Sequence, residues 1–286
     1  MFIVTGASGT LGRKIIENLL LRVPAASIGI SVRDPAKVAD FEARGVRVRQ
    51  GDYRDAESLR HAWGGAERLL LVSSNAAATG GNPLAEHAAA IRAAREVGVK
   101  RVFYTSQISS AATSLFPPGR DHAATEKMLE ESGLAWTAMR HGFYAASALM
   151  MNARGFAAGT LEGPEDGKVA WTTHDDLAAA DAALLVGSEV IDGPTPPLTG
   201  NETLDLADLA KLAGDILGRP ITRTILSEAS MEAKARAAGM PEQSLHVMLG
   251  YYRAARAGEF EVNDGLLASL LGRAPQTMGL VLKANL

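Results

Sequence analysis

Short apolar runs alternate with amphipathic segments through the first half of the chain. The apolar runs predict six strands, at residues 2–5, 28–32, 46–49, 69–72, 102–105 and 136–139. Between the strands, apolar residues recur at helical spacing, first at Leu11, Ile15, Ile16, Leu19 and Leu20 and again at Ala88, Ile91, Ala94 and Val97. This alternation predicts a parallel sheet covered by helices on both faces, in the doubly wound order of a Rossmann-type α/β fold.

Capping residues support these helix boundaries. Asp34 followed by Pro35 is typical of an N-cap and the first position of a helix. Asp55 is suited to cap the next helix. Gly98 follows the helical pattern that finishes near Val97, as a residue that ends a helix does.

After about residue 140 the alternation of strands and helices becomes looser. The pattern there predicts helices at 175–186 and 204–217, a strand at 221–226, and one or two helices within 231–256. We therefore expect a Rossmann core over residues 1–140. Residues 141–286 are expected to form a small C-terminal α/β lobe on the substrate side, interleaved with the core.

Charge and composition exclude several classes of protein. The formal net charge is −3, whereas a protein that binds nucleic acid normally carries a basic domain or stripe. Cysteine is absent and the six histidines lack ligand spacing, so we expect neither disulfides nor a metal site. No signal-peptide pattern opens the chain and no apolar run reaches about 20 residues, so we expect a cytoplasmic protein without membrane contact. The oligomeric state stays open.

A glycine loop follows the first predicted strand and opens the first predicted helix. Gly6 permits a tight turn, Gly9 lets a pyrophosphate approach the backbone, and Gly12 lets the helix pack closely on the strand. The helix N-terminus supplies N–H groups for the anion. The spacing is G-x-x-G-x-x-G, and its place between strand and helix predicts a dinucleotide site. The other loop residues expected at this site are Ser8, Thr10 and Leu11.

The end of the second strand indicates which dinucleotide is bound. An NAD-binding protein places Asp or Glu there to hold the ribose hydroxyls, whereas Arg33 suits a 2′-phosphate through charge and paired hydrogen bonds. Asp34 is the competing candidate, but its position before Pro35 favours a capping role. The sequence therefore predicts NADP(H).

Further polar residues follow the third, fourth and fifth strands, at the sheet edge where ligands bind in open α/β folds. Asp52 is a candidate acceptor for the adenine amine, or else a solvated turn residue, and Tyr53 follows it. The candidates on the next two strands, which ordinary turn chemistry would also explain, are Ser73, Ser74, Thr105 and Ser106.

With these residues identified, the chain resembles the NmrA-like atypical short-chain dehydrogenases, and within them the bacterial NAD(P)H:quinone oxidoreductase and triphenylmethane reductase group. The shared segments are residues 5–12, 21–25, 32–35, 51–53, 124–129 and 140–144. The resemblance runs the length of the chain. It implies that the segment after the sixth strand lies beside the nicotinamide, which places Gly142, Phe143 and Tyr144 near the substrate.

The chain departs from ordinary short-chain dehydrogenases at their Tyr-x-x-x-Lys pair, in which lysine lowers the pKa of a tyrosine that exchanges a proton with the substrate. Lys127 is present, but Ala123 stands four residues before it. His122 is five residues before Lys127, about 140° around a helix, so it does not simply replace the tyrosine. A ketone or secondary alcohol substrate is therefore disfavoured.

Reduction of a quinone does not require such a proton-donating tyrosine. Hydride addition gives a weakly basic phenolate, which nearby hydrogen-bond donors can stabilise without a dedicated acid. Lys127 is expected to donate to the nicotinamide ribose or to stabilise this charge, with a solvated helix lysine as the alternative. Tyr144 and His141 are the other catalytic candidates, although His141 departs from the family pattern, which favours a loop histidine over a donor in the pocket. We expect an NADPH-dependent reductase of a quinone or similar apolar acceptor. The alternatives are reduction of triphenylmethane-like compounds and non-catalytic NADP(H) sensing.

Overall fold

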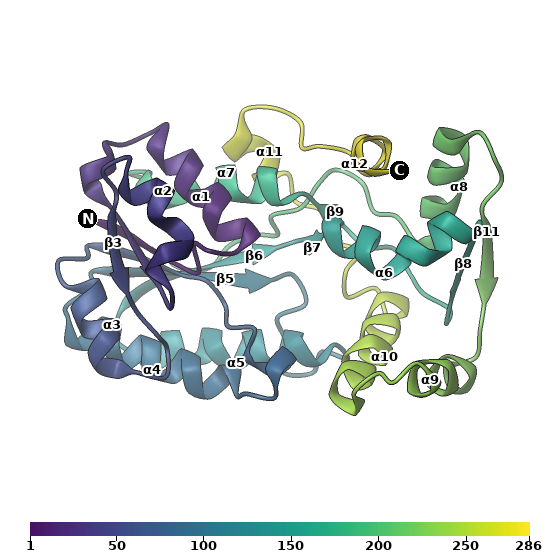
Figure 1. Cartoon of the computed structure of the whole chain (residues 1–286), viewed down its shortest axis with the longest axis horizontal. Helices are drawn as coiled ribbons and strands as arrows, with labels where there is room; N and C mark the ends of the chain where they lie inside the picture. The colour runs from purple at the N-terminus through teal and green to yellow at the C-terminus, as the bar shows by residue number, and fades with distance from the viewer. The chain divides into compact units, whose positions relative to one another are not determined.

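A computed structural model describes residues 1–286, apart from the side chains of residues 78 and 79. The described residues form a seven-stranded sheet in the order β10-β6-β5-β4-β1-β2-β3 with parallel pairing (Figure 1). Its strands are β1 (Phe2–Thr5), β2 (Ile28–Val32), β3 (Arg47–Gln50), β4 (Arg68–Leu71), β5 (Arg101–Gln107), β6 (Ala135–His141) and β10 (Gly193–Pro194). All six predicted strands are present, and the expected Rossmann-type α/β fold is confirmed.

The position of each strand in the sheet explains its sequence. All five residues of β2 are buried, because an inner strand of a parallel sheet is covered on both faces and therefore has no polar side. The edge strand β3 instead carries Arg47 and Arg49. It begins one residue later than the apolar pattern predicts. The guanidinium of Arg47 reaches the Ala62 and Gly64 carbonyls, both at 2.9 Å.

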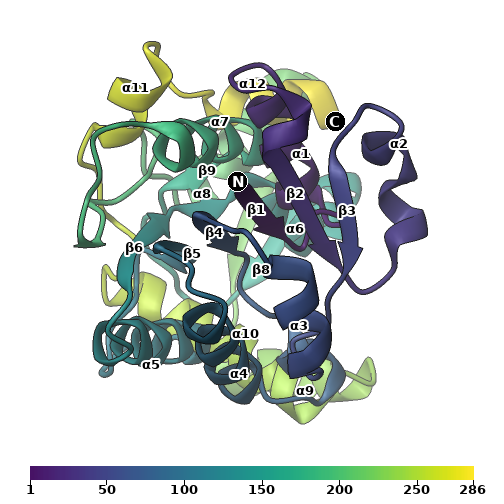
Figure 2. The same ribbon diagram turned by 90° about the vertical axis from the view of Figure 1, so that its left-hand side faces the viewer.

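Helices cover both faces of the sheet, as Figures 1 and 2 show. One face carries α1 (Thr10–Leu20), α2 (Ala39–Glu42) and α7 (His174–Val186). The other carries α3 (Ala56–Trp63), α4 (Pro83–Glu96) and much of α5 (Pro117–Glu131). Three short 3-10 turns complete this part: η1 (Ala25–Ser27), η2 (Pro35–Val38) and η3 (Ala76–Thr79). None of the helices in the described structure is both long and apolar enough to cross a membrane.

The chain divides into two compact units that interleave along the sequence. The first unit contains residues 1–106, 121–140 and 174–196, and the second contains 107–120, 141–173 and 197–286. The boundary expected at residue 140 is one of the points where the chain passes from one unit to the other. The first unit thus gains α7 and β10 from far along the chain, and the second gains residues 107–120 from before the boundary.

The second unit is built mainly from helices and two short parallel strand pairs. The pairs are β7 (Phe143–Tyr144) with β9 (Trp171–Thr172), and β8 (Thr160–Gly163) with β11 (Thr222–Ile225). Its helices are α6 (Ala145–Ala158), α8 (Leu206–Leu217), α9 (Glu228–Ala237), α10 (Glu242–Arg256), α11 (Leu266–Leu271) and α12 (Met278–Asn285). The predicted segment 231–256 is therefore two helices, separated where Gly239 adopts a φ of 75° and Pro241 follows.

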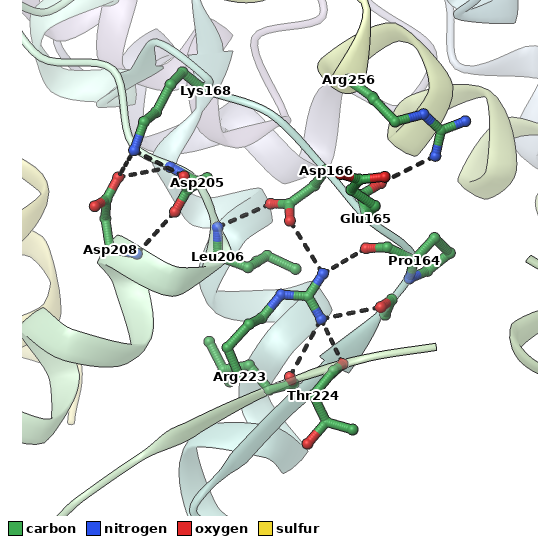
Figure 3. A network of polar contacts seen from close by, with 12 residues as sticks. Pro164, Glu165, Asp166, Lys168, Asp205, Leu206, Asp208, Arg223, Thr224 and Arg256 are labelled. Carbon is green, nitrogen blue, oxygen red and sulfur yellow. Dashed lines mark hydrogen bonds and ion pairs between the residues drawn. The ribbon is translucent and has the colours of Figure 1, made fainter. Parts of the chain in front are cut away.

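A buried ion pair holds the segment between β8 and β9 (Figure 3). Arg223 of β11 lies 3.0 Å from Asp166, and it also donates to the carbonyl oxygens of Gly163 at 3.0 Å and Pro164. Asp166 in turn accepts from the backbone N–H of Leu206, the first residue of α8, at 2.8 Å. This network joins β8, β11 and the start of α8, so the segment that leads to β9 has a defined path.

Candidate functional site

The glycine loop between β1 and α1 has the conformation that its sequence predicts. Gly6 adopts a φ of 64°, and its carbonyl accepts from the Gly9 N–H at 2.9 Å. A Cβ added at Gly12 would lie 2.5 Å from that carbonyl oxygen, so no side chain fits there. At Gly9 the nearest atom to an added Cβ is 3.4 Å away, an ordinary contact. The turn and close packing expected of Gly6 and Gly12 are thus present.

The N-terminus of α1 differs from those of α3, α4 and α8. Side chains cap the first turns of α3, α4 and α8, from Asp55, Asn82 and Asp205 respectively. The N-cap of α1 is Gly9, which offers no side-chain acceptor, and its first turn holds no acidic residue. Backbone N–H groups and the positive end of the helix dipole are therefore available to an anion at this place. The loop fits the diphosphate of a dinucleotide.

The two candidate residues for the ribose, Arg33 and Asp34, follow β2 and make different contacts. The Asp34 carboxylate accepts from the Ala36 N–H at 3.1 Å and caps η2, so its expected capping role is confirmed. Arg33 is exposed, and its carbonyl accepts from the Gln50 side chain at 3.3 Å. The cation is therefore presented to solvent at this edge, while the neighbouring carboxylate is engaged by the backbone.

Residues after β3 make internal contacts that the sequence does not reveal. Hydrogen bonds from Arg54 to both oxygens of Asp52, at 3.1 and 2.8 Å, lower the pKa of that carboxyl. The Tyr53 hydroxyl donates to the Val72 carbonyl at 2.8 Å and lies 2.6 Å from Thr5 Oγ1, and burial raises the pKa of this phenol. A contact of Asp52 or Tyr53 with adenine stays a prediction.

Hydroxyl groups at the ends of β4 and β5 have defined hydrogen-bond partners. Thr105 Oγ1 accepts from the Ser73 N–H at 2.8 Å and lies 3.3 Å from Ser73 Oγ. Ser74 Oγ donates to the Glu86 carboxylate through a short contact, and Ser106 Oγ donates to Glu126 at 2.5 Å. These candidates lie at the same edge as the glycine loop, where the carboxyl ends of the parallel strands meet.

Glu126 is a further candidate site residue, which the sequence alone does not indicate. It is buried on α5, and Arg140 at the end of β6 binds its two oxygens at 3.1 and 2.6 Å. With the Ser106 hydroxyl, the carboxylate joins the ends of β5 and β6 to α5. No local pattern marks this acid, because its partners come from strands 20 residues before it and 14 after it.

The neighbouring Lys127 points away from this buried network. Its side chain is 72% exposed, and its ammonium lies 3.8 Å from Glu131 one turn further along α5. His122 meets the buried Tyr104 hydroxyl through Nδ1 at 2.8 Å. A solvent-facing Lys127 agrees with the solvated lysine that the sequence left open, and its contact with a cofactor stays a prediction.

The candidates from the last residue of β6 onward belong to the second unit. His141 is buried and its ring lies 6.4 Å from that of Tyr144, the N-cap of α6. A Cβ added at Gly142 would lie 2.2 Å from Thr172 Oγ1, so this glycine permits close packing on β9. Phe143 packs edge-on against the rings of Trp171, Tyr251 and Phe260, with centroids 5.1–5.5 Å away. A role of these residues beside a nicotinamide stays a prediction.

Comparison with known proteins identifies the class to which this fold and glycine loop belong. Residues 6–185 match the family described as NAD(P)H-binding, and the chain belongs to that family. It is 35% identical to quinone oxidoreductase 2 of Escherichia coli, over 97% of this chain and 96% of that protein. It is also 31% identical to an NmrA-like family domain-containing oxidoreductase of Aspergillus flavus, over 96% and 91%.

Solved structures support the same assignment. The E. coli NADPH-dependent quinone oxidoreductase in complex with NADPH has a TM-score of 0.93, with 33% identity and 99% of both chains covered. The Citrobacter sp. triphenylmethane reductase in complex with NADP(H) has a TM-score of 0.90, with 28% identity and both chains fully covered. The resemblance expected from the sequence is therefore confirmed.

Proposed function

We propose that the protein is an NADPH-dependent reductase that transfers a hydride to a quinone or a similarly conjugated acceptor. The observation that carries this proposal is the 35% identity with the E. coli quinone oxidoreductase along nearly the whole of both chains. The open glycine loop and the exposed Arg33 support it independently, because they suit a diphosphate and a 2′-phosphate.

The first unit supplies the groups that would hold NADP(H). The backbone from Gly6 to Gly12 and the first turn of α1 would hold the diphosphate, and Arg33 would pair with the 2′-phosphate. Serine and threonine side chains at the ends of β4 and β5 shape the rest of this edge. When bound, the reduced nicotinamide supplies the hydride.

The reaction is quinone plus NADPH plus a proton giving hydroquinone plus NADP⁺. The hydride and its electron pair go to the quinone, one oxygen becomes a phenolate, and a proton from solvent neutralises it. Because a phenolate is a weak base, an alanine at position 123 is no obstacle to turnover. Lys127 would donate to the ribose or to the developing oxyanion, and Tyr144 and His141 would line the acceptor site.

Triphenylmethane compounds form a second acceptor class. Full-length similarity to the Citrobacter triphenylmethane reductase, with a TM-score of 0.90, favours a site that accepts large, conjugated electrophiles. Such cations accept a hydride at carbon and need no proton donor, in agreement with the missing tyrosine acid.

The experiment is steady-state oxidation of NADPH and NADH with a panel of benzoquinones, naphthoquinones and triphenylmethane dyes. We expect the highest kcat/KM with NADPH and a quinone. Gly9→Val serves as the matched variant in which the diphosphate is sterically excluded. Tight binding of NADPH without turnover of any acceptor would contradict the proposal and favour a redox sensor.

A further inference from the structure

The three residues that follow β4 have an unusual set of hydrogen-bond partners. The N–H groups of Val72, Ser73 and Ser74 each donate to a side chain, at 2.8 Å in every case. The acceptors are Thr5 Oγ1 at the end of β1, Thr105 Oγ1 on β5, and His87 Nε2 on α4. Three separate elements thus fix the course of this short loop.

The loop lies directly against the glycine loop. A Cβ added at Gly6 would be 3.1 Å from the Cβ of Val72, so the two backbones approach each other closely here. The Tyr53 hydroxyl also donates to the Val72 carbonyl at 2.8 Å. A displacement of residues 72–74 would therefore alter the space beside Gly6.

His87 holds the far end of this loop from a buried position. Its side chain is 2% exposed, and its ring packs edge-on against Tyr104 at 5.4 Å. Because Nε2 accepts from Ser74, the neutral ring carries its proton on Nδ1 and donates it to Thr125 Oγ1 at 2.8 Å. The Thr125 hydroxyl donates to the Asp121 carbonyl oxygen at 2.8 Å, which leaves the hydroxyl oxygen to accept from His87 Nδ1.

The surroundings of His87 keep the imidazole neutral. Burial lowers its pKa to about 4. Glu86, its neighbour on α4, is hydrogen-bonded to the Ser74 hydroxyl. The other titratable groups are on β5 and α5: Tyr104, whose hydroxyl meets His122, and Asp121, which contributes its carbonyl oxygen. A protonated ring could not accept from the Ser74 N–H.

We propose that His87 is a positioning residue of the nucleotide site, which acts by fixing the Ser74 N–H and with it the loop of residues 72–74 against the glycine loop. This inference rests on the proposed function only in that the site binds NADP(H). The contacts argue for a role beyond core packing, because an apolar residue at position 87 would fill the space and leave the part-buried Ser74 N–H without this acceptor.

Two near-isosteric variants separate the two sides of the ring. His87→Gln keeps an acceptor where Nε2 stands, and His87→Asn keeps a donor where Nδ1 stands but has no group that reaches Ser74. We expect His87→Asn to raise the Kd for NADPH and its KM about two- to tenfold, the loss of one neutral hydrogen bond. His87→Gln is expected to stay within twofold of the wild type, and kcat to change little in either variant.

The measurements are NADPH titrations by fluorescence and steady-state kinetics, with thermal unfolding to establish that both variants are folded. Equal affinity of the two variants would overturn the inference. If the wild type binds no NADPH, both this inference and the proposed function fail; if it binds and the variants agree, only the inference fails.

Two substitutions of Thr125 on α5 provide a second test if His87→Asn does not fold. Thr125→Val removes the acceptor of the Nδ1 proton, so the ring no longer prefers the form that accepts from Ser74. Thr125→Ser keeps the hydroxyl. We expect weaker NADPH binding in Thr125→Val and wild-type binding in Thr125→Ser, and equal binding in the two would contradict a positioning role.

Discussion

Arg33 and Asp34 are adjacent at the end of β2, but their side chains have different surroundings. The carboxylate caps η2, whereas the guanidinium is exposed. We predict that Arg33→Ala weakens NADPH binding by about 1.5–3 kcal/mol, the value of a hydrogen bond to a charged group, and leaves NADH binding nearly unchanged. Titration of each variant with both nucleotides measures this.

The control is Arg60→Ala, which removes an exposed arginine of α3 that pairs with Glu96 at 2.9 Å. It should leave both affinities unaltered. Equal affinity of the wild type for NADPH and NADH would refute the assignment of Arg33 to the 2′-phosphate.

Lys127 tests whether a solvent-facing cation on α5 takes part in turnover. Its ammonium lies 3.8 Å from Glu131, and exposed pairs of this kind contribute only about 0.3–0.5 kcal/mol. If Lys127 stabilises developing charge, Lys127→Ala should lower kcat by about 10²–10³. A role in holding the ribose would instead raise the KM for NADPH. Glu131→Gln, which spares the ammonium, should have wild-type kinetics, and identical kinetics in both variants would make Lys127 a surface residue.

Tyr144 tests whether another phenol has replaced the missing acid. General acids contribute about 10²–10⁴ to a rate, whereas quinone reduction should need none. We expect Tyr144→Phe to reduce quinone turnover only slightly, since it removes a hydroxyl and keeps the ring. A loss of turnover with intact NADPH affinity would show that a proton donor is required.

At the scale of elements, the glycine loop offers a pair of contrasting substitutions. A Cβ at Gly9 would meet no atom closer than 3.4 Å, so Gly9→Val should fold normally and fail to bind NADPH. A side chain at Gly12 would approach the Gly6 carbonyl to 2.5 Å, so Gly12→Ala should destabilise the fold by about 1–3 kcal/mol as well. Thermal unfolding and NADPH titration distinguish the two, and normal binding by Gly9→Val would mean that the loop does not contact the cofactor.

The same elements show how far the sequence reveals the structure. The bounds of β1 and β2 follow from apolar runs because inner parallel strands are buried on both faces. The two-residue strands β7, β9 and β10 leave no such pattern, since tertiary pairing alone defines them. A strand of two residues is too short to show a repeating pattern of apolar and polar positions.

Side-chain networks are hidden from the sequence for a related reason. Glu126 and His87 have the polarity of surface residues, and only the fold brings Ser106, Arg140 and Ser74 to them. The glycine loop and Arg33 could be predicted because their function depends on a local order of residues.

At the scale of the whole molecule, His87 links stability to pH. Its pKa is about 4 in the folded chain and near 6.5 when unfolded, so the unfolded state binds more protons between these values. Stability is therefore fully present above pH 6.5 and falls as the pH drops towards 4, by roughly 3 kcal/mol from this group. Urea unfolding across this range should show the loss, and His87→Gln should flatten it; an unchanged slope in the variant would contradict a buried neutral histidine.

The interleaving of the two units has a consequence for synthesis on the ribosome. Chains emerge from the N-terminus, and domains tend to fold as soon as their residues are available. The first unit lacks α7, the neighbour of α1, and the edge strand β10 until residue 196 has emerged. By then residues 107–120 and 141–173 of the second unit are already outside, while the partners that complete their core are still to be translated. The nascent chain therefore carries an unfinished apolar surface of the second unit until residues 197–286 have joined it.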